Sequence, residues 1–344
     1  MQESNKVPFV SVVIPVYNES KHIENCVGSV LKHDYPAEQM EILLVDGMSN
    51  DGTPDIIERL CQEDSRIHFL QNPKRIVPSA LNIAIKASRG EIIVRMDCHC
   101  IYPPIYVSTL VGKLVELNAA NVGGVWLTEP ANDSSICHAI ALCSSHPFGT
   151  GPSLHKIGCD EVTETDTVPF GCFRKDIFDK IGLFDEEMLR NEDEELNGRI
   201  TRQGGRIFIV PQVEMHYMSR DSLGKMIKMY YHYGLWKPLV NKKVGNAVTY
   251  RQFIPPLFVL GCVLGLLLGL FFKPILAIWA FVMLFSFIVV FAIGIKEAMK
   301  RHRPALCLLM PVTFLCMHFA YGIGYLKGIV GLVFKDSLTY HYDR

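Results

Sequence analysis

The sequence predicts an α/β domain with a mostly parallel sheet flanked by helices, followed by helices that cross a membrane. The first part rests on residues 9–211, where short apolar runs alternate with longer amphipathic segments, the pattern of βα units. The second part rests on the C-terminal region, to which the long uncharged runs are confined. A chain of 344 residues is long enough for one catalytic domain and such a membrane domain.

The elements of the first region can be assigned in order along the chain. The expected strands are the apolar runs at residues 11–16, 41–46, 67–70, 91–97, 121–126 and 206–211. The expected helices cover residues 21–32, 53–64 and 78–87. Ser79 is a candidate N-cap of the third helix, in which Leu81 and Ile85 belong to an apolar stripe.

Three uncharged runs follow, and each is close to the ~20 residues that cross a hydrocarbon core. They cover residues 254–272, 274–295 and 305–326. Only Lys273 separates the first two, so we expect a tight hairpin. Basic residues precede the first run and follow the second, which by the positive-inside rule puts both flanks in the cytoplasm. They are Lys237, Lys242, Lys243, Arg251 and the basic segment 296–303.

The third run is the weakest, because His318 and several glycines interrupt it and Lys327 follows closely. We expect it to span the membrane, which places the C-terminus outside; a re-entrant or interfacial segment is the alternative. On the first run Gly261, Gly265 and Gly269 recur every four residues. This face is suited to close helix packing, although small residues on a lipid-facing helix would give the same pattern.

Composition excludes some functions and sets the expected boundaries. The formal net charge of -1 does not indicate nucleic-acid binding. Eleven cysteines without a CxxC pair favour a reduced compartment, and the first residues lack the features of a signal peptide. We expect a cytoplasmic domain at residues 1–230, a juxtamembrane linker at 231–253, an integral membrane domain at 254–334 and a tail at 335–344.

The candidate chemistry lies at strand ends. Neither a Walker loop nor a GxGxxG fingerprint is present, so any phosphates must be held in another way. Asp46 ends the second expected strand, Asp97 ends the fourth, and Asn18 and Glu19 follow the first. Ligands of open α/β sheets bind at this edge.

Five segments in order along residues 9–211 resemble the family 2 glycosyltransferases, which are inverting enzymes of the GT-A fold, a nucleotide-diphospho-sugar transferase fold. They are "VSVVIPVYNES", "ILLVDGMSNDGT", "ALNIAIKASRGEIIVRMDCH", "VPFGCFRKDIFDKIGLFDE" and "RNEDEELNGRITRQGG". More narrowly, "NPKRIVPSALNIAI", "SSHPFGTG", "DTVPFGCFRKDIF" and "YGLWK" are similar to succinoglycan-type glucosyltransferases of exopolysaccharide assembly.

The resemblance implies a nucleotide-sugar site. In the family the acid at the end of the second strand accepts a hydrogen bond from the nucleotide base, and Asp46 occupies that position; an acid there can also simply cap the next turn. Glu19 can likewise be a solvated acid at a helix start. The implied nucleotide-sugar-binding residues are Pro15, Tyr17, Asn18, Glu19, Asp46, Asn82 and Asp97.

The resemblance also implies a divalent cation at Asp97 and His99, the family's acid-x-acid position with histidine as its second member. A cation neutralises the donor diphosphate as the bond to the sugar breaks; oxygen ligands suit Mg²⁺ or Mn²⁺, and an imidazole shifts the preference toward Mn²⁺. Two alternatives stay open: a zinc site formed by Cys98, His99 and Cys100, and a plain buried histidine. By strand alternation, Cys98 and Cys100 face away from Asp97 into packing.

Inverting transfer needs a general base for the acceptor hydroxyl. The family's base corresponds to Asp193, with Glu192 and Glu194 orienting it or touching the acceptor, and Arg199 facing these acids one turn later. Four acids at a helix start are also favourable to the helix dipole without any catalysis.

Trp236 stands where processive members of the family stack a tryptophan on the acceptor sugar, but the accompanying Gln and Arg are absent. This favours addition of a single sugar. Trp236 can equally be an anchor at the membrane interface. His216 and Arg220 are weaker candidates for contact with the diphosphate.

These expectations define a membrane-anchored, metal-dependent hexosyltransferase that transfers glucose from UDP-glucose to a polyprenyl-diphosphate-linked saccharide. The cation is Mn²⁺ or Mg²⁺, and the oligomeric state is open. The alternatives are a processive polysaccharide synthase and a non-catalytic membrane scaffold that keeps the fold.

Overall fold

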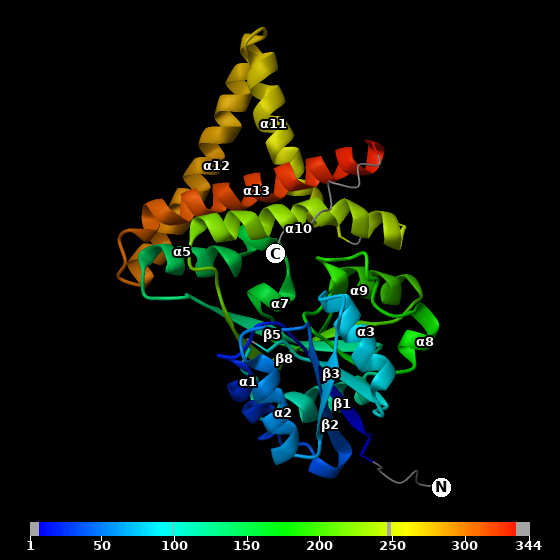
Figure 1. Ribbon diagram of the computed structural model, residues 1–344. Helices are drawn as coiled ribbons and strands as arrows, with labels where there is room; N and C mark the ends of the chain where they lie inside the picture. Colours follow the sequence, from blue (N-terminus) through cyan, green and yellow to red (C-terminus); the bar gives the residue numbers. More distant parts are fainter. Residues whose placement is uncertain (1–6, 99, 246–248, 335–344) are drawn as a thin grey trace. The chain divides into compact units, whose positions relative to one another are not determined.

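The computed structural model describes residues 7–98, 100–245 and 249–334 (Figure 1). Two compact units make up the chain. The first contains Met1–Leu127 and Gly158–His216, and the second contains Thr128–Ile157 and Tyr217–Arg344.

An eight-stranded sheet organises the first unit, in the order β3-β2-β1-β4-β7-β5-β8-β6. The strands β1, β2, β3 and β4 are parallel, whereas β7 runs antiparallel to both β4 and β5. The bounds are β1 Val10–Val16, β2 Met40–Asp46, β3 Ile67–Gln71, β4 Ile92–Arg95, β5 Asn121–Glu129, β6 Thr163–Glu164, β7 Cys172–Arg174 and β8 Ile207–Met218. The mostly parallel sheet is thereby confirmed, with all six expected strands.

The sequence did not reveal β6 and β7, which have only two and three residues. A glycine turn makes β7 possible. Gly171 has φ +95°, and a Cβ there would collide with the ring of Phe173 and the side chain of Asn121. Only glycine adopts this positive φ without strain and also has no Cβ to collide with these side chains. The turn brings β7 beside β4.

Helices flank this sheet: α1 Ile23–Val30, η1 Ala37–Gln39, α2 Thr53–Glu63, α3 Val77–Ala87, α4 Tyr106–Glu116, α8 Ile177–Ile181 and α9 Glu192–Arg202. The three helices expected from the sequence are present, with ends shifted by one or two residues. Ser79 does not cap α3, because the helix begins at Val77 and Ser79 is buried inside its first turn.

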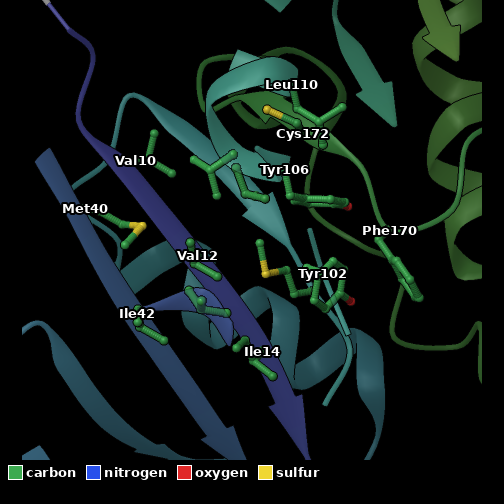
Figure 2. Packing of buried hydrophobic residues seen from close by; sticks show 14 of the residues in the cluster. Val10, Val12, Ile14, Met40, Ile42, Tyr102, Tyr106, Leu110, Phe170 and Cys172 are labelled. Atoms are coloured by element: carbon green, nitrogen blue, oxygen red, sulfur yellow. The ribbon is translucent and has the colours of Figure 1, made fainter. Parts of the chain in front are cut away.

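The main core lies on one face of the sheet. Figure 2 shows alternate residues of β1, Val10, Val12 and Ile14, projecting to one side, and they pack in one cluster with Tyr102 and Tyr106. This period-2 pattern is that of a strand with a buried face. The other face carries Ser11, Val13 and, on β4, Arg95.

The second unit is helical. It contains α5 Ser135–Ser144, α6 Pro147–Thr150, α7 Leu154–Ile157, α10 Leu223–Val244, η2 Tyr250–Phe253, α11 Ile254–Gly269, α12 Lys273–Lys300 and α13 Leu306–Phe334. The sequence places a domain boundary at residue 230 and a linker over 231–253, whereas in the structure α10 runs continuously through residue 230. This helix packs along α13.

Among the described residues of this unit, three helices are long and apolar enough to cross a membrane: Tyr250–Gly269, Lys273–Lys300 and Leu306–Phe334. Figure 1 shows α11 and α12 as the expected hairpin. Gly265 and Gly269 allow close packing against Trp279 and Leu276 of α12, while nothing lies within 4 Å of a Cβ at Gly261. The glycine face thus serves helix packing at two of its three positions.

Candidate active site

A buried arginine on β4 gathers three carboxylates. The guanidinium of Arg95 lies 3.1 Å from Glu192, 3.4 Å from Asp193 and 3.5 Å from Asp97. Its side chain is 5% exposed, and the Cζ atom of its guanidinium lies 5.7 Å from the ring centroid of Phe170. One buried positive charge therefore faces three carboxyl groups, which leaves the cluster with excess negative charge.

The acids come from two elements that meet at the carboxyl edge of the sheet. Asp97 follows β4, while Glu192 and Asp193 open α9, whose N-terminus favours negative charge. Asn191 enters the helix with φ +60°, a conformation that asparagine tolerates. The backbone N–H of Arg95 donates to the carbonyl of Gly171 at 2.9 Å, which fixes the end of β4.

The carboxyl of Asp193 has a raised pKa. Burial, and then the neighbouring Glu192, raise the pKa of Asp193 to about 7, although Arg95 opposes the shift. The side chain is still 29% exposed, so an entering hydroxyl can reach it. A base whose pKa lies near neutral pH accepts a proton effectively.

Arg95 was not among the residues expected from the sequence. The available signal was a single charge in the apolar strand "EIIVRMD", two residues before Asp97 and so on the same face of the strand. Its ion pair with Glu192 joins residues 97 positions apart. Such a partner cannot be found from local pattern.

Two loops at the ends of β1 and β2 are tied together beside this edge. The backbone N–H groups of Asn18, Glu19 and Ser20 donate to Ser49, Thr53 and Asp51 at 2.8, 3.0 and 3.1 Å. In return, Asn50 N–H donates to the side chain of Asn18 at 3.0 Å. Asn18 itself has φ +54°. These bonds preorganise the segment that the family resemblance places beside the nucleotide.

Asp46 is buried and caps the turn after β2. Its carboxylate accepts hydrogen bonds from the N–H and hydroxyl of Ser49, at 2.9 and 2.5 Å. Each oxygen keeps a further lone pair for a ligand, so capping and nucleotide contact are compatible. Pro15 lies in β1 opposite Val45. The ring of Tyr17 lies against Gly47 and is 41% exposed, which leaves a face for a planar ligand.

Asn82 serves packing in this structure. Its side-chain amide donates to the carbonyl of Phe184 and accepts from the N–H of Phe184, both at 2.9 Å. A second donation goes to Glu186 at 3.2 Å. Because these bonds pin α3 to the segment before α9, the expectation of a donor contact from Asn82 is not supported.

Arg199 is also structural. It pairs with Glu195, the fourth acid of α9, and donates to the carbonyls of Ile181 and Leu183 at 2.6 and 2.8 Å. It faces an acid, as expected, and its bonds hold α9 to the end of α8. Glu194 is partly buried in the first turn of α9.

The second metal ligand expected, His99, lies outside the described residues. Among those described, no group of three His, Cys, Asp or Glu side chains is arranged to hold a metal ion. Cys98 and Cys100 are buried in the main core, as expected. Burial, and then Asp97, raise the pKa of Cys100 to about 12, and the placement of both thiols inside the packed core does not suit the zinc alternative.

Trp236 belongs to the core of the second unit, where it is 1% exposed. Neither expected role fits, because stacking on a sugar and anchoring in an interface both require an accessible ring. Of the weaker candidates, His216 lies exposed at the end of β8 and bridges the backbone of Ile101. Arg220 is exposed in the second unit and donates to the sulfur of Met229.

Parallel strands with acids at their carboxyl edge, an antiparallel β7 beside β4 and acids that open α9 are features of glycosyltransferases of the GT-A fold. Residues 11–182, half of the chain, match the family described as Glycosyl transferase family 2. The chain belongs to this family.

Relatives agree with this assignment over nearly the full length. The chain is 28% identical to succinoglycan biosynthesis protein ExoA of Rhizobium meliloti (strain 1021), over 93% of this chain and 94% of the relative. It is 26% identical to a dolichyl N-acetyl-alpha-D-glucosaminyl phosphate 3-beta-D-2,3-diacetamido-2,3-dideoxy-beta-D-glucuronosyltransferase of Methanococcus voltae, over 94% and 97%. The first relative is named for polysaccharide synthesis and the second for lipid-linked glycan synthesis.

A solved structure supports the fold. The mannosyltransferase PcManGT from Pyrobaculum calidifontis, solved in complex with GDP-Man and Mn²⁺, matches with a TM-score of 0.61 at 19% identity. The match covers 94% of this chain and 88% of that structure.

Proposed function

We propose that the chain is an inverting hexosyltransferase that uses UDP-glucose and adds one sugar to a polyprenyl-diphosphate-linked saccharide at a membrane. The carrying observation is Asp193, a partly exposed carboxyl with a pKa of about 7 beside Arg95 at the carboxyl edge of the sheet. The relatives that act in succinoglycan synthesis and on a dolichyl-linked sugar support this substrate class.

In the proposed reaction Asp193 takes the proton of the acceptor hydroxyl, which then attacks the anomeric carbon from the face opposite the leaving diphosphate. Glu192 raises the basicity of Asp193, and Arg95 holds both acids in place. On the donor side, Asp46, Tyr17 and the bonded loops receive the nucleotide. Positioning of the two substrates supplies much of the rate.

A divalent cation fits the residues present. The excess negative charge around Arg95 and the carboxylate of Asp97 provide the hard oxygen chemistry that Mg²⁺ and Mn²⁺ prefer, and such ions take one or two carboxylates plus substrate phosphates. The solved mannosyltransferase contains Mn²⁺. Asp97, with His99 as its proposed companion, would hold the ion. When bound, the cation neutralises charge on the departing diphosphate.

The membrane helices fit an acceptor that is confined to a lipid surface. Basic residues flank the α11–α12 hairpin at Arg251 and at Lys300 and Arg301, and the positive-inside rule then places both flanks, and the catalytic unit, in the cytoplasm. Enzyme and acceptor would share one surface, which raises the rate of encounter.

The test uses the full chain in detergent or vesicles with a panel of nucleotide sugars. UDP release should be fastest with UDP-glucose and should rise when a lipid-linked saccharide is added. Product analysis should show a single added sugar of inverted anomeric configuration. Faster turnover of another donor would change the proposed sugar, a ladder of products would indicate a processive synthase, and absence of nucleotide binding would favour the scaffold.

A further inference from the structure

The base of the α11–α12 hairpin is spread apart, and α13 joins its two legs. The legs touch near their turn, at Gly265 and Gly269. At their other ends they contact different parts of α13. A Cβ at Gly294 of α12 would lie 3.0 Å from the carbonyl oxygen of Cys307, and one at Gly322 of α13 would lie 2.5 Å from the carbonyl oxygen of Pro255 in α11.

These two contact points are about 15 residues apart on α13, which is about 22 Å at the helical rise. The helix therefore crosses the base from one leg to the other and does not run along either leg. Figure 1 shows α13 lying across the base of the hairpin.

The same helix packs backbone to backbone against α10. A Cβ at Gly234 of α10 would collide with the carbonyl oxygen of Tyr321, and one at Gly324 or Gly328 of α13 would collide with the carbonyl oxygens of Tyr231 or Leu235. Figure 1 shows the two helices side by side. They are joined over more than one turn, so they must share the same environment.

That environment is not the centre of a bilayer. Five lysines occur in α10, at positions 225, 228, 237, 242 and 243, and each lysine at the centre of a membrane carries a large cost. If α13 crossed the hydrocarbon core, the middle of α10 would be drawn toward it.

The free face of α13 is nevertheless apolar. Its exposed side chains recur at helical spacing and include Leu308, Val312, Leu315, Ile323, Val330 and Val333. By contrast, the buried face of α13 carries Met310, Phe314 and Met317, which pack in a cluster with α5 and α10. The apolar stripe can face lipid in either placement, and the polar side that an isolated interfacial helix carries itself is replaced here by the packed α5 and α10.

We infer that α13 lies along the membrane surface with its apolar stripe in the acyl boundary, and that only α11 and α12 cross the bilayer. Lys300 and Arg301, at the end of α12, then lie at the level of the lipid headgroups, where cations are favourable. The chain crosses twice, so the residues before α11 and those after α13 lie on the same side. Hydropathy alone favours the opposite placement of the C-terminus.

The inference can be tested on the full chain without reference to activity. Epitope tags are placed before Met1, after Arg344, and between Phe272 and Lys273 in the hairpin turn, each in a separate protein. In inverted membrane vesicles, added protease should remove both terminal tags and leave the turn tag. A C-terminal tag that is protected together with the turn tag, while the N-terminal tag is removed, would show that α13 spans and would overturn the inference.

A second measurement compares lysine substitutions. Leu315→Lys and Ile323→Lys place a charge on the exposed stripe of α13, from which an in-plane helix lets it reach the headgroups. The amount of membrane-inserted protein should stay near that of the unaltered chain. Phe285→Lys, in the middle of α12, should lower it several-fold. An equal loss for Leu315→Lys and Phe285→Lys would overturn the in-plane placement.

Discussion

At the scale of single residues, the cluster around Arg95 explains how acids can collect in a buried place. A buried guanidinium stabilises carboxylates by charge and by hydrogen bonds, while burial acts against every charge involved. Burial lowers the pKa of Arg95, yet Asp193, Asp97 and Glu192 together raise it well above its usual value. Arg95 therefore stays charged at all working pH values.

Replacement of Asp193, the proposed base, should lower transfer strongly. Asp193→Asn should lower the rate of sugar transfer by roughly 100- to 10,000-fold, the usual contribution of a general base. Binding of UDP should change little, because Asp193 lies on the acceptor side in the proposed reaction. The control is Asp55→Asn, an exposed acid in the first turn of α2, which should transfer at the normal rate.

The pH dependence follows from the same residue. Because the pKa of Asp193 is raised to about 7, the base is protonated below neutrality, and kcat/KM should rise with pH and level off above about 7. A rate already constant from pH 5 upward would contradict the assignment.

Replacement of Arg95 should destabilise the fold and shift the pH dependence of kcat/KM. Arg95→Met leaves three carboxylates near one another without compensation, which should lower the free energy of unfolding by about 3 kcal/mol. In the protein that remains folded, the acid limb of the rate profile should move to higher pH, because Arg95 no longer opposes the raised pKa of Asp193.

The matched control is Arg59→Met, which breaks the exposed ion pair with Glu24. Such surface pairs contribute little, so its urea midpoint should stay near that of the unaltered chain. A purely structural role for Arg95 would lower stability without moving the pH profile.

At the scale of elements, the sequence was most informative where a pattern repeats. The alternation in β1 and the uncharged runs of α11 and α12 were read correctly, because side-chain burial follows the period of the element itself. A three-residue strand such as β7 has too few residues to show a period. Much of the segment expected to be a linker belongs to α10, a helix that packs along the neighbouring α13.

The α10–α13 contact yields an element-scale prediction. Gly324→Ala places a methyl group against the carbonyl oxygen of Tyr231, and overpacking of this kind costs about 1–3 kcal/mol. The thermal unfolding midpoint of the full chain in detergent should fall. Gly261→Ala, where nothing lies within 4 Å, is the control and should not lower it; equal midpoints for the two proteins would contradict the packing described.

At the scale of the whole molecule, donor binding should depend on a divalent cation. The Kd for UDP, measured by calorimetry on the full chain, should rise at least tenfold after treatment with a chelator and recover with Mn²⁺ or Mg²⁺. Asp97→Asn should remove most of this cation dependence, because Asp97 is the described residue proposed to hold the ion. Glu186→Gln, on the exposed pair with Lys74, is a control. Tight UDP binding in the chelator would contradict the proposed cation.

The site was partly readable from the sequence. Asp46, Asp97 and Asp193 could be named because strand ends and a helix start are local features, and the resemblance to a family attaches roles to them. Asn82 and Arg199 could not be judged in the same way. Their side chains are engaged by Phe184, Ile181 and Leu183, and those contacts exist only after folding.

By itself the sequence determined the α/β class, the family, the carboxyl-edge acids and the apolar helical hairpin, since each depends on the order and period of residues along the chain. Only the tertiary structure decided that Arg95 binds the acids of α9, that Trp236 is buried and that α13 packs along α10. The physical reason is distance in the chain: Arg95 and Glu192 are 97 positions apart, and such contacts follow from how the elements pack.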